Sequence, residues 1–377
     1  MMRFLDAKPD SRHEWLDWWQ RTGSEPFAHP DYVSLLAETH DQVMALTWSD
    51  PAGGQALLPL IRRPIPTDLH LQSEAASLPW TDIVSPYGYG GPFTSGTVDS
   101  SALFGALLGW MRDERVVTAF IRPSPTHVPP AGLELEGYET RHVGDIVIVG
   151  LGRSRDDQWR HYEHKVRKNV NKASRAGMRV EILHDFIHLD EFVEIYTETM
   201  GRRGASSWYF FGRPLFERLG ETLSGNYVLA EVYEPSGRIV SVELVLVSDR
   251  FLYSFLGGTR RDAFRHAPND LLKHAVIDYG RDLGKEGYVL GGGYLPDDGV
   301  FRYKRAFDVG GIQPFTVVQL TAEQRVRRTL DRARLAQARR EHPDAELPPD
   351  FFPPYRAPLA PPSADHGAET RAAKEDG

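Results

Sequence analysis

The stretch GGGYLPDDGVFRYKRAF, residues 291–307, decides the fold, because a glycine-rich acidic loop runs straight into a cationic, aromatic segment. Upstream, residues 268–290 predict a helix and then a buried strand, the helix carrying an apolar stripe of Leu272, Ala275, Val276, Tyr279 and Leu283. The loop therefore leaves the end of a core strand. Open α/β sheets bind ligands beyond the ends of their strands, so we expect Lys304, which follows such a strand end, to contact a ligand. The alternative is that Lys304 is an ordinary solvated surface lysine.

Periodic patterns on both sides of this stretch predict an α/β (α+β) fold. Helices are predicted over residues 11–22, 30–39, 101–112, 156–177, 190–201 and 268–283. Strands are predicted over residues 43–48, 55–61, 116–121, 145–149, 227–233, 239–247, 251–256, 288–290 and 311–320. The three strands from 227 to 256 follow one another through short turns, which indicates an antiparallel meander.

The length of 377 residues predicts two domains, since about 150 residues is typical of one. We divide the chain into residues 1–152 and 153–320, followed by a C-terminal helix over 321–342 and a tail over 343–377. Thr321 and Gln324 resemble a capping box for that arginine-rich helix. The tail is rich in proline and alanine, so we expect it to be disordered.

Composition excludes several classes of function. The net charge of −8 argues against general nucleic-acid binding, so DNA is not an expected partner and any RNA contact would use a local basic patch. The absence of cysteine excludes disulfides, cysteine-ligated zinc and thiol catalysis. The N-terminal residues lack the pattern of a signal peptide, and no apolar run has membrane-spanning length, so a cytoplasmic location is expected.

One local basic patch lies on the predicted helix over residues 156–177. Its cations recur on one face at i, i+3, i+7 and i+10, namely Lys165, Lys168, Lys172 and Arg175. The opposite face carries the apolar residues Trp159, Val166, Val170 and Ala173. A solvated face is the usual explanation, but acidic residues are missing from 165–179, which favours a phosphate-bearing partner such as tRNA.

Three further segments supply candidate substrate-binding residues. The loop over residues 79–93, PWTDIVSPYGYGGPF, combines glycines with Asp82, Tyr87 and Tyr89, and a plain turn is the alternative. Residues 201–216, GRRGASSWYFFGRPLF, place arginines beside aromatic rings, which suits an anionic, partly planar ligand; we select Arg202, Arg203 and Tyr209. Tyr303, next to Lys304, completes the set.

Other catalytic patterns are weak or missing. The His184/His188 pair has metal-ligand spacing but no convincing third ligand, so no metal site is predicted. No G-x-S-x-G elbow, P-loop or G-x-G-x-x-G fingerprint occurs, which argues against serine hydrolases, NTPases and dinucleotide enzymes. Asp82 and Asp297 are guesses for a general base.

Several segments, in order, resemble the Fem family of aminoacyltransferases within the GNAT superfamily. They are HKVRKNVNKASRAGMRVEI (164–182), IYTETMGRRGASSWYFF (195–211), FLGGT (255–259), NDLL (269–272) and the stretch from GGG to FRYKRAF. In the first unit, SPYGYGGPF (85–93) resembles a segment of bacterial Fem-like proteins. The resemblance implies two GNAT-like domains, each a mixed, largely antiparallel sheet flanked by helices, packed around a substrate channel, with the C-terminal segment returning to the first domain.

The resemblance also implies a function. Family members transfer an amino acid from aminoacyl-tRNA to an amine on a peptidoglycan precursor, and relatives in antibiotic pathways acylate small metabolites. Lys304 occupies the position of the family's lysine, and Arg203, next to Arg202, matches the arginine that holds the acceptor phosphate. The chain departs from the family pattern in two ways. It lacks the helical arm of the larger members, which suggests a short form, and it carries a long arginine-rich C-terminal helix. We expect a monomer without a cofactor, with aminoacyl-tRNA as co-substrate.

The chemistry of aminoacyl transfer also supports this function. Aminolysis of an ester builds negative charge on the carbonyl oxygen, which a fixed ammonium such as Lys304 stabilises in the transition state. One alternative is an acyl-CoA-dependent N-acyltransferase, against which the chain lacks a Q/R-x-x-G-x-G/A loop ahead of the helix at Asn269. The other is a non-catalytic binding protein on the same scaffold.

Overall fold

In the computed structural model of this chain, the structure describes residues 1–65, 79–126, 129–205, 209–295 and 297–359. Among these residues the strands form a 13-stranded mixed sheet in the order β1-β2-β3-β4-β6-β13-β7-β12-β11-β10-β9-β8, with β5 paired to β3. The strands are β1 Met2–Asp6, β2 Gln42–Ser49, β3 Gln55–Pro64, β4 Thr81–Val84, β5 Phe93–Ser95, β6 Val116–Ile121, β7 Tyr138–Gly150, β8 Arg179–Leu183, β9 Tyr227–Tyr233, β10 Ile239–Val247, β11 Phe251–Thr259, β12 Gly287–Gly291 and β13 Ile312–Thr321.

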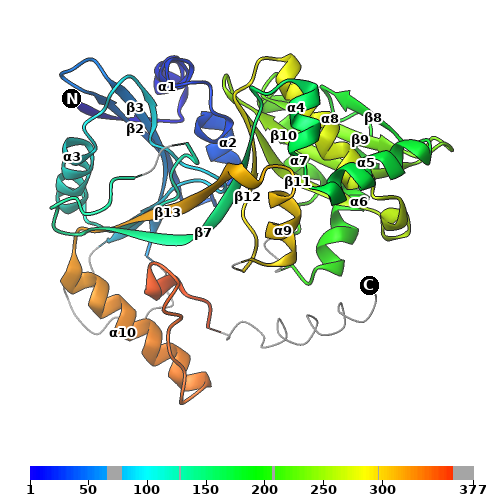
Figure 1. Cartoon of the computed structure of the whole chain (residues 1–377). Helices are drawn as coiled ribbons and strands as arrows, with labels where there is room; N and C mark the ends of the chain where they lie inside the picture. The colour runs from blue at the N-terminus through cyan, green and yellow to red at the C-terminus, as the bar shows by residue number, and fades with distance from the viewer. Residues whose placement is uncertain (66–78, 127–128, 206–208, 296, 360–377) are drawn as a thin grey trace.

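Helices cover both faces of this sheet, which confirms the predicted α/β class (Figure 1). They are α1 Pro9–Arg21, α2 Pro30–Leu35, α3 Ser100–Asp113, α4 Arg155–His161, α5 His164–Arg175, α6 Leu189–Arg202, α7 Arg213–Thr222, α8 Pro268–Asp282, α9 Gly299–Arg305 and α10 Gln324–Glu341. Short 3₁₀ turns include η1 Pro26–Ala28, η4 Arg261–His266 and η6 Pro354–Arg356. No helix of the described residues is both long and apolar enough to cross a membrane.

Two strands join the halves of the sheet. In Figure 1, β7 and β13 run from the half that holds β1–β4 toward the half that holds β8–β11. β13 lies antiparallel between β6 and β7, so that Val318 pairs with Ile121 on one side and with Thr140 on the other. β7 also pairs with β12. The chain therefore returns to its first half after completing the second, as the family resemblance implied, while the division at residue 152 stays a prediction.

The two halves repeat one arrangement of strands and helix. In each half, a helix lies in the connection between two parallel strands. In the first half α3 lies between β4 and β6, after β5, and in the second half α8 connects β11 to β12. The β11–β12 pairing lasts only from Phe251–Gly287 to Tyr253–Val289. Beyond Tyr253 the two strands no longer pair, and a loop over residues 292–298 leads from β12 to α9. This separation of β11 and β12 positions the candidate site.

Burial alternates along the joining strand, and this defines the cores. Ile146 and Ile148 face a cluster that also contains α1, α2, α6 and α7. Val147 and Val149 face the opposite cluster, built from α5, α8 and α9. A third core packs α3 against β2, β3 and β6. Because both large clusters include β7, the site between β12 and α9 rests on a sheet that is buried on both faces.

Three local predictions were wrong. The helix predicted over 156–177 is two helices, because Tyr162 adopts an extended backbone and buries its ring 5.7 Å from that of Phe307. The helix predicted over 30–39 ends at Leu35. The loop predicted over 79–93 contains strand β4, which runs parallel to β6.

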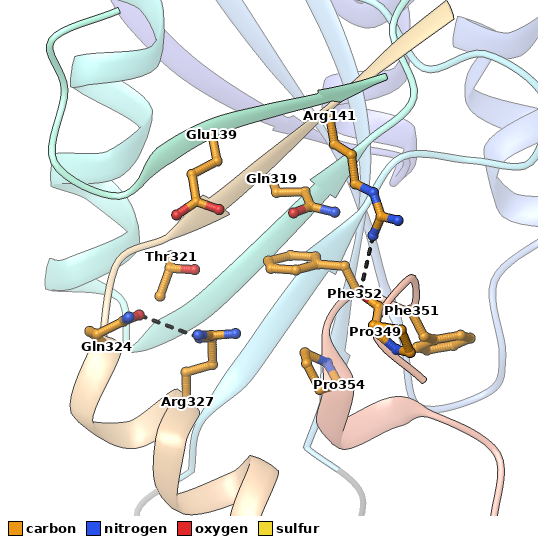
Figure 2. Close-up of a pocket in the computed structure, with 10 residues that line it drawn as sticks. All are labelled: Glu139, Arg141, Gln319, Thr321, Gln324, Arg327, Pro349, Phe351, Phe352 and Pro354. Carbon is orange, nitrogen blue, oxygen red and sulfur yellow. Dashed lines mark hydrogen bonds between the residues drawn. The ribbon is translucent and has the colours of Figure 1, made fainter. Parts of the chain in front are cut away.

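The C-terminal predictions also need correction. Thr321 is the last residue of β13, and α10 begins at Gln324 with no side-chain cap, so the predicted capping box does not form. The tail does not begin at residue 343: residues 343–359 pack against α10, and Tyr355 and Ala357 are fully buried. Figure 2 shows this segment beside α10 and the ends of β7 and β13. The remainder of the predicted tail, residues 360–377, lies outside the described residues.

Candidate active site

The loop between β12 and α9 is built around Asp298. Its Oδ1 accepts the backbone N–H of Phe301 at 2.7 Å, which caps α9, and its Oδ2 accepts the N–H groups of Tyr294 and Leu295 at 2.7 and 3.1 Å. Burial acts to raise the Asp298 pKa, but these backbone hydrogen bonds outweigh it and lower the pKa. Asp298 therefore organises the loop. Its neighbour Asp297 is at the surface and forms ion pairs with Arg302 and Arg305.

All three glycines of the GGG triplet are constrained by this geometry, and a Cβ atom on Gly292 would lie 2.8 Å from the carbonyl oxygen of Asp145. Gly291 has φ of +75°, a conformation that side chains rarely adopt. At Gly293 a Cβ atom would lie 2.3 Å from Oδ1 of Asp298, which is too close for any other residue. The backbone of β12 can therefore turn sharply at Gly291 and pass close to Asp298, and this turn brings the chain back toward Lys304.

Lys304 projects from α9 onto this loop. Its Nζ donates to the carbonyl oxygen of Gly292 at 2.7 Å. No other hydrogen bond or ion pair of Lys304 occurs within the described chain, so two of the three ammonium N–H groups remain available to a ligand. A Cβ on Gly291 would lie 3.7 Å from Nζ of Lys304 and 3.7 Å from the hydroxyl of Tyr89, so Tyr89 reaches the same place.

Burial lowers the pKa of Lys304 to about 8, and the positive charge of Lys273 acts in the same direction. The carboxylates of Glu243 and Asp298 oppose this shift. Lys304 is thus a cation whose charge is poorly solvated. An ammonium in such surroundings interacts more strongly with developing negative charge than it would in water.

A second lysine lies beneath the site in a buried polar cluster. Nζ of Lys273 contacts Oε1 of Glu243 at 2.5 Å and also donates to Ser254 at 2.7 Å. Oε1 of Glu243 accepts the hydroxyl of Tyr288 at 2.7 Å. Oε2 of Glu243 and the hydroxyl of Tyr303 are buried without a hydrogen-bond partner among the described residues. A buried polar atom without a hydrogen-bond partner lowers the stability of the fold. Packing alone therefore does not explain this cluster.

The two candidate arginines occupy different surroundings. Arg202 donates to Glu198, Thr199 and the carbonyl of Thr259, and its guanidinium lies 4.8 Å from the ring centroid of Phe264. Arg203 is exposed at the end of α6, and its side chain makes no hydrogen bond or ion pair within the described chain. The positive charge of Arg203 also acts to lower the pKa of Lys304. The structure therefore favours Arg203 as the ligand-facing arginine.

The predicted tyrosines from the two halves of the chain meet. The rings of Tyr87 and Tyr209 lie 6.2 Å apart, and the ring of Tyr87 lies 5.8 Å from that of Phe255 on β11. The backbone of Tyr87 is held by the hydroxyl of Tyr32 at 2.8 Å. Burial raises the pKa of Tyr87, and the proximity of Tyr209 and Tyr294 adds to the shift. Aromatic rings from both halves thus border the glycine-rich loop.

Asp82 is placed elsewhere, contrary to its predicted role in binding substrate or as a base. Its side chain is fully buried on β4 and accepts Nε of Arg63 at 2.9 Å. Its other oxygen accepts the Tyr355 hydroxyl at 3.1 Å and is ion-paired with Arg356. Asp82 therefore holds the C-terminal segment, and its carboxylate has no free position for a ligand.

The cationic residues of α5 are exposed as predicted, and Val166, Val170 and Ala173 on the opposite face are buried. The stripe begins close to the site. Asn169 donates to the buried Asp270 of α8 at 3.2 Å, and the charge of Lys165 acts on the same carboxyl. Burial also raises the pKa of Tyr303 beside Asp270. The stripe of Lys165, Lys168, Lys172 and Arg175 thus leads away from the neighbourhood of Lys304 along the surface.

Sequence reasoning missed Lys273, Glu243 and the buried Glu25, which accepts the hydroxyl of Tyr253 at 2.7 Å. A signal for one of them was present. Lys273 is on the core-facing side of α8, together with Asp270 and Ile277, at i, i+3 and i+7. Charged residues at core positions of an amphipathic helix point to a buried polar cluster.

Two hollows of the structure lie away from Lys304. One of about 140 Å³ is bordered by β7, β13, α10 and the C-terminal segment, as Figure 2 shows. Another, of about 270 Å³, is lined by residues of both halves, including Glu25, Ser124 and Arg250. The described residues contain no group of three or more His, Asp or Glu side chains placed to hold a metal ion.

Comparison with known proteins shows which families this chain is similar to. Residues 160–305, which include α5, the β11–β12 separation and Lys304, match the Acetyltransferase (GNAT) domain family. A curated relative, the UDP-N-acetylmuramoylpentapeptide-lysine N(6)-alanyltransferase of Weissella viridescens, is 24% identical over 150 residues, which are 39% of this chain and 43% of that protein. The chain is thus similar over residues 160–305 to GNAT acetyltransferase domains, and over 150 residues to a Fem-type alanyltransferase. It therefore spans under half the length of the curated relative that it matches.

Solved structures have the same fold as this chain. The crystal structure of FemX superposes with a TM-score of 0.63 at 14% identity, covering 86% of this chain and 99% of that one. The structure of L-PGS from Bacillus licheniformis superposes with a TM-score of 0.54 at 14% identity, covering 83% and 92%. At 14% identity this similarity shows the fold alone, that is, the arrangement of both halves of the sheet.

Proposed function

We propose that this chain is an aminoacyltransferase that moves an aminoacyl group from aminoacyl-tRNA to an amine and forms an amide bond. The observation that carries the proposal is Lys304, an ammonium with two free N–H donors, fixed by Gly292 where β11 and β12 separate. A carbonyl oxygen placed there receives a preorganised positive charge. Because aminoacyl-tRNA is a cytoplasmic co-substrate, the proposal places the chain in the cytoplasm, acting as a monomer without a further cofactor.

The reaction follows from the chemistry of an ester and an amine. The amine nitrogen attacks the ester carbonyl carbon, and negative charge develops on the carbonyl oxygen beside Lys304. The intermediate collapses by breaking the bond to the terminal ribose oxygen of the tRNA. The proton that the amine loses balances the one that this leaving oxygen gains. Asp82 is fully engaged by Arg63, Arg356 and Tyr355, so we do not assign it as the base.

The surroundings of Lys304 fit the two substrates. We assign the cationic stripe of α5 to the phosphates of the tRNA, because it begins beside Tyr303 and carries no acidic residue. Arg203 and the rings of Tyr87, Tyr89 and Tyr209 then face the acceptor. The name of the curated relative describes alanyl transfer to the lysine of a pentapeptide precursor, which supports a peptide-borne primary amine as the acceptor class. A small amine-bearing metabolite is the other acceptor.

An acyl-CoA donor is the alternative, favoured by the match to the Acetyltransferase (GNAT) domain. Such a donor needs backbone N–H groups for its pyrophosphate at the start of α8. Here residues 260–267 contain no glycine, the turn η4 fills the approach, and Pro268 removes one N–H from the first turn. These features favour the tRNA donor.

The test is transfer of radiolabelled amino acids from a charged tRNA pool to cell-wall precursors and small amines, with and without RNase, beside a parallel assay with labelled acetyl-CoA. We expect RNase-sensitive transfer that Lys304→Ala slows by about 10²–10³-fold and that Lys8→Ala, at an exposed lysine of the first half, leaves intact. Transfer from acetyl-CoA alone would replace the proposal with the alternative. Acceptor binding without transfer from either donor would indicate a non-catalytic binding protein.

A further inference from the structure

The arginines of α10 divide into two groups. The helix carries seven arginines and two acidic residues in a chain of net charge −8. Those that turn inward are paired: Arg327 with Asp331 at 3.5 Å, and Arg334 with the carbonyl of Ala357 at 2.7 Å. Figure 2 shows Arg327 directed toward Gln324 at the crevice beside β13. These inward arginines serve to attach the helix and the C-terminal segment to the sheet.

The outward arginines have no such role. Arg325, Arg328 and Arg332 are exposed at i, i+3 and i+7, and Arg340 is exposed near the end of the helix. Their side chains make no hydrogen bond or ion pair within the described chain. The same i, i+3, i+7 spacing occurs in Lys165, Lys168 and Lys172 on α5. Neighbouring guanidinium groups without acidic partners repel one another. Binding of an anionic partner would relieve this repulsion, so the row favours such a partner.

The shape of the helix favours a nucleic acid over a membrane. A helix that lies on a membrane inserts an apolar face, but the apolar side of α10 is already buried: Val326 and Leu330 pack against Tyr355 and Val117. The exposed side of the helix carries the guanidinium groups of Arg325, Arg328 and Arg332, and their planar forks match phosphate oxygens in pairs. The row extends along two turns of a rigid helix, which suits consecutive phosphates of a polynucleotide backbone.

We infer that the outward face of α10, defined by Arg325, Arg328 and Arg332, is a second RNA-binding surface that contacts the phosphate backbone of the tRNA. This inference rests on the proposed function for the identity of the RNA. It assigns the arginine-rich helix a task that neither the Lys304 site nor the α5 stripe performs. Figure 1 shows α10 and α5 in different halves of the molecule, so the two surfaces contact different parts of one extended ligand.

The experiment measures binding of bulk uncharged tRNA to the full chain by fluorescence anisotropy at several salt concentrations. Arg328→Gln/Arg332→Gln should weaken binding on the order of tenfold at low salt and reduce the slope of log K against log salt by about 2. The double variant Arg328→Lys/Arg332→Lys should keep most of the affinity, because the charge is retained. The control is Arg3→Gln/Arg21→Gln, which changes one exposed arginine on β1 and one at the end of α1 and should bind tRNA as the wild type does.

Unchanged affinity and salt slope in Arg328→Gln/Arg332→Gln would overturn the inference, as would an equal loss in the control. Loss of binding to vesicles of phosphatidylglycerol without loss of tRNA binding would assign the face to lipid instead, and also overturn it. Failure of the proposed function is separate: it appears as absent transfer by the wild-type protein, whereas this measurement needs no transfer. A circular-dichroism melt of each variant confirms that the chain is folded.

Discussion

Tyr89 and Lys304 meet at Gly291: a Cβ atom there would lie 3.7 Å from the Tyr89 hydroxyl and 3.7 Å from Nζ of Lys304. One residue comes from the first half of the chain and the other from α9. The site is therefore complete only when both halves are folded together. Phe315 on β13 supports this contact, with its ring 5.6 Å from that of Tyr89.

The charge of Lys304 should be visible in the pH dependence of transfer. Its pKa is lowered to about 8, chiefly by burial, so the ammonium is lost as the pH rises through about 8. If the ammonium stabilises the oxyanion, kcat/KM falls above that pH by about tenfold per unit. Lys304→Arg, whose guanidinium stays charged, should remove this decline, and Lys304→Ala should lose about 10²–10³-fold in rate.

The measurement is kcat/KM between pH 6 and 9.5, with the spontaneous hydrolysis of the aminoacyl ester subtracted from enzyme-free samples. A rate that instead rises through pH 8 in the wild type and is lost in Lys304→Arg would show that the neutral amine acts as a base. In that case the oxyanion role of Lys304 would be wrong.

The adjacent arginines should separate into a binding residue and a structural one. Arg203→Ala removes an exposed cation without a protein partner, so we expect KM for the acceptor to rise about tenfold with little change in stability. Arg202→Ala breaks its hydrogen bonds to the carbonyl of Thr259 and to Thr199, and should cost about 1–2 kcal/mol of unfolding free energy. Steady-state kinetics and urea melts of both variants check this. The reverse outcome would assign ligand binding to Arg202.

Asp82 should matter for the C-terminal segment and not for chemistry. Asp82→Asn removes the charge that pairs with Arg63 and Arg356, and should lower stability by a few kcal/mol. Arg356→Ala should act in the same direction and by less, because Arg63 still pairs with the carboxylate. Limited proteolysis should cut residues 343–359 faster in both variants, while KM and kcat of the folded fraction stay unchanged. A selective loss of kcat in Asp82→Asn alone would restore the predicted catalytic role.

The second half of the chain was predicted well because its pattern is local. The strands over 227–233 and 239–247 have the predicted bounds, and β11 begins at the predicted residue. Helix α8 ends one residue before the predicted end. Buried strands and amphipathic helices produce a regular spacing of apolar residues, and a proline marks the start of this helix. Both signals can be recognised without knowing the rest of the chain.

The contacts between distant segments were not predictable from local pattern. The placement of β13 between β6 and β7 depends on strand register; the family resemblance implied only that the C-terminal segment returns to the first domain. Asp82 and Arg356 are 274 positions apart, so nothing near either residue indicates the pair. Lys304, Tyr89 and Arg203 were identified as separate candidates. The fold brings Tyr89 and Lys304 to Gly291, and the charge of Arg203 acts on Lys304, but their common role in a site stays a prediction.

The buried carboxyl of Glu25 should make stability depend on pH with an unusual sign. Burial raises its pKa from 4.5 to about 7 in the folded chain, although the Tyr253 hydroxyl opposes the shift. Between these values the unfolded carboxyl is ionised while the folded one holds a proton, so stability is fully present below about pH 4.5 and is lost as the pH rises to about 7. The loss amounts to ~3 kcal/mol, from 1.36 kcal/mol per pKa unit.

Glu25→Gln keeps an oxygen to accept the Tyr253 hydroxyl and removes the titration. At pH 8 the variant should therefore be more stable than the wild type, whereas at pH 4.5 the two should be similar. The measurement is urea unfolding at pH 4.5, 6 and 8, and the exposed Glu221, changed to glutamine, is the control. If Glu25→Gln and the wild type differ by the same amount at every pH, then Glu25 is ionised in the folded chain, and a neighbouring cation such as Arg250 compensates its charge.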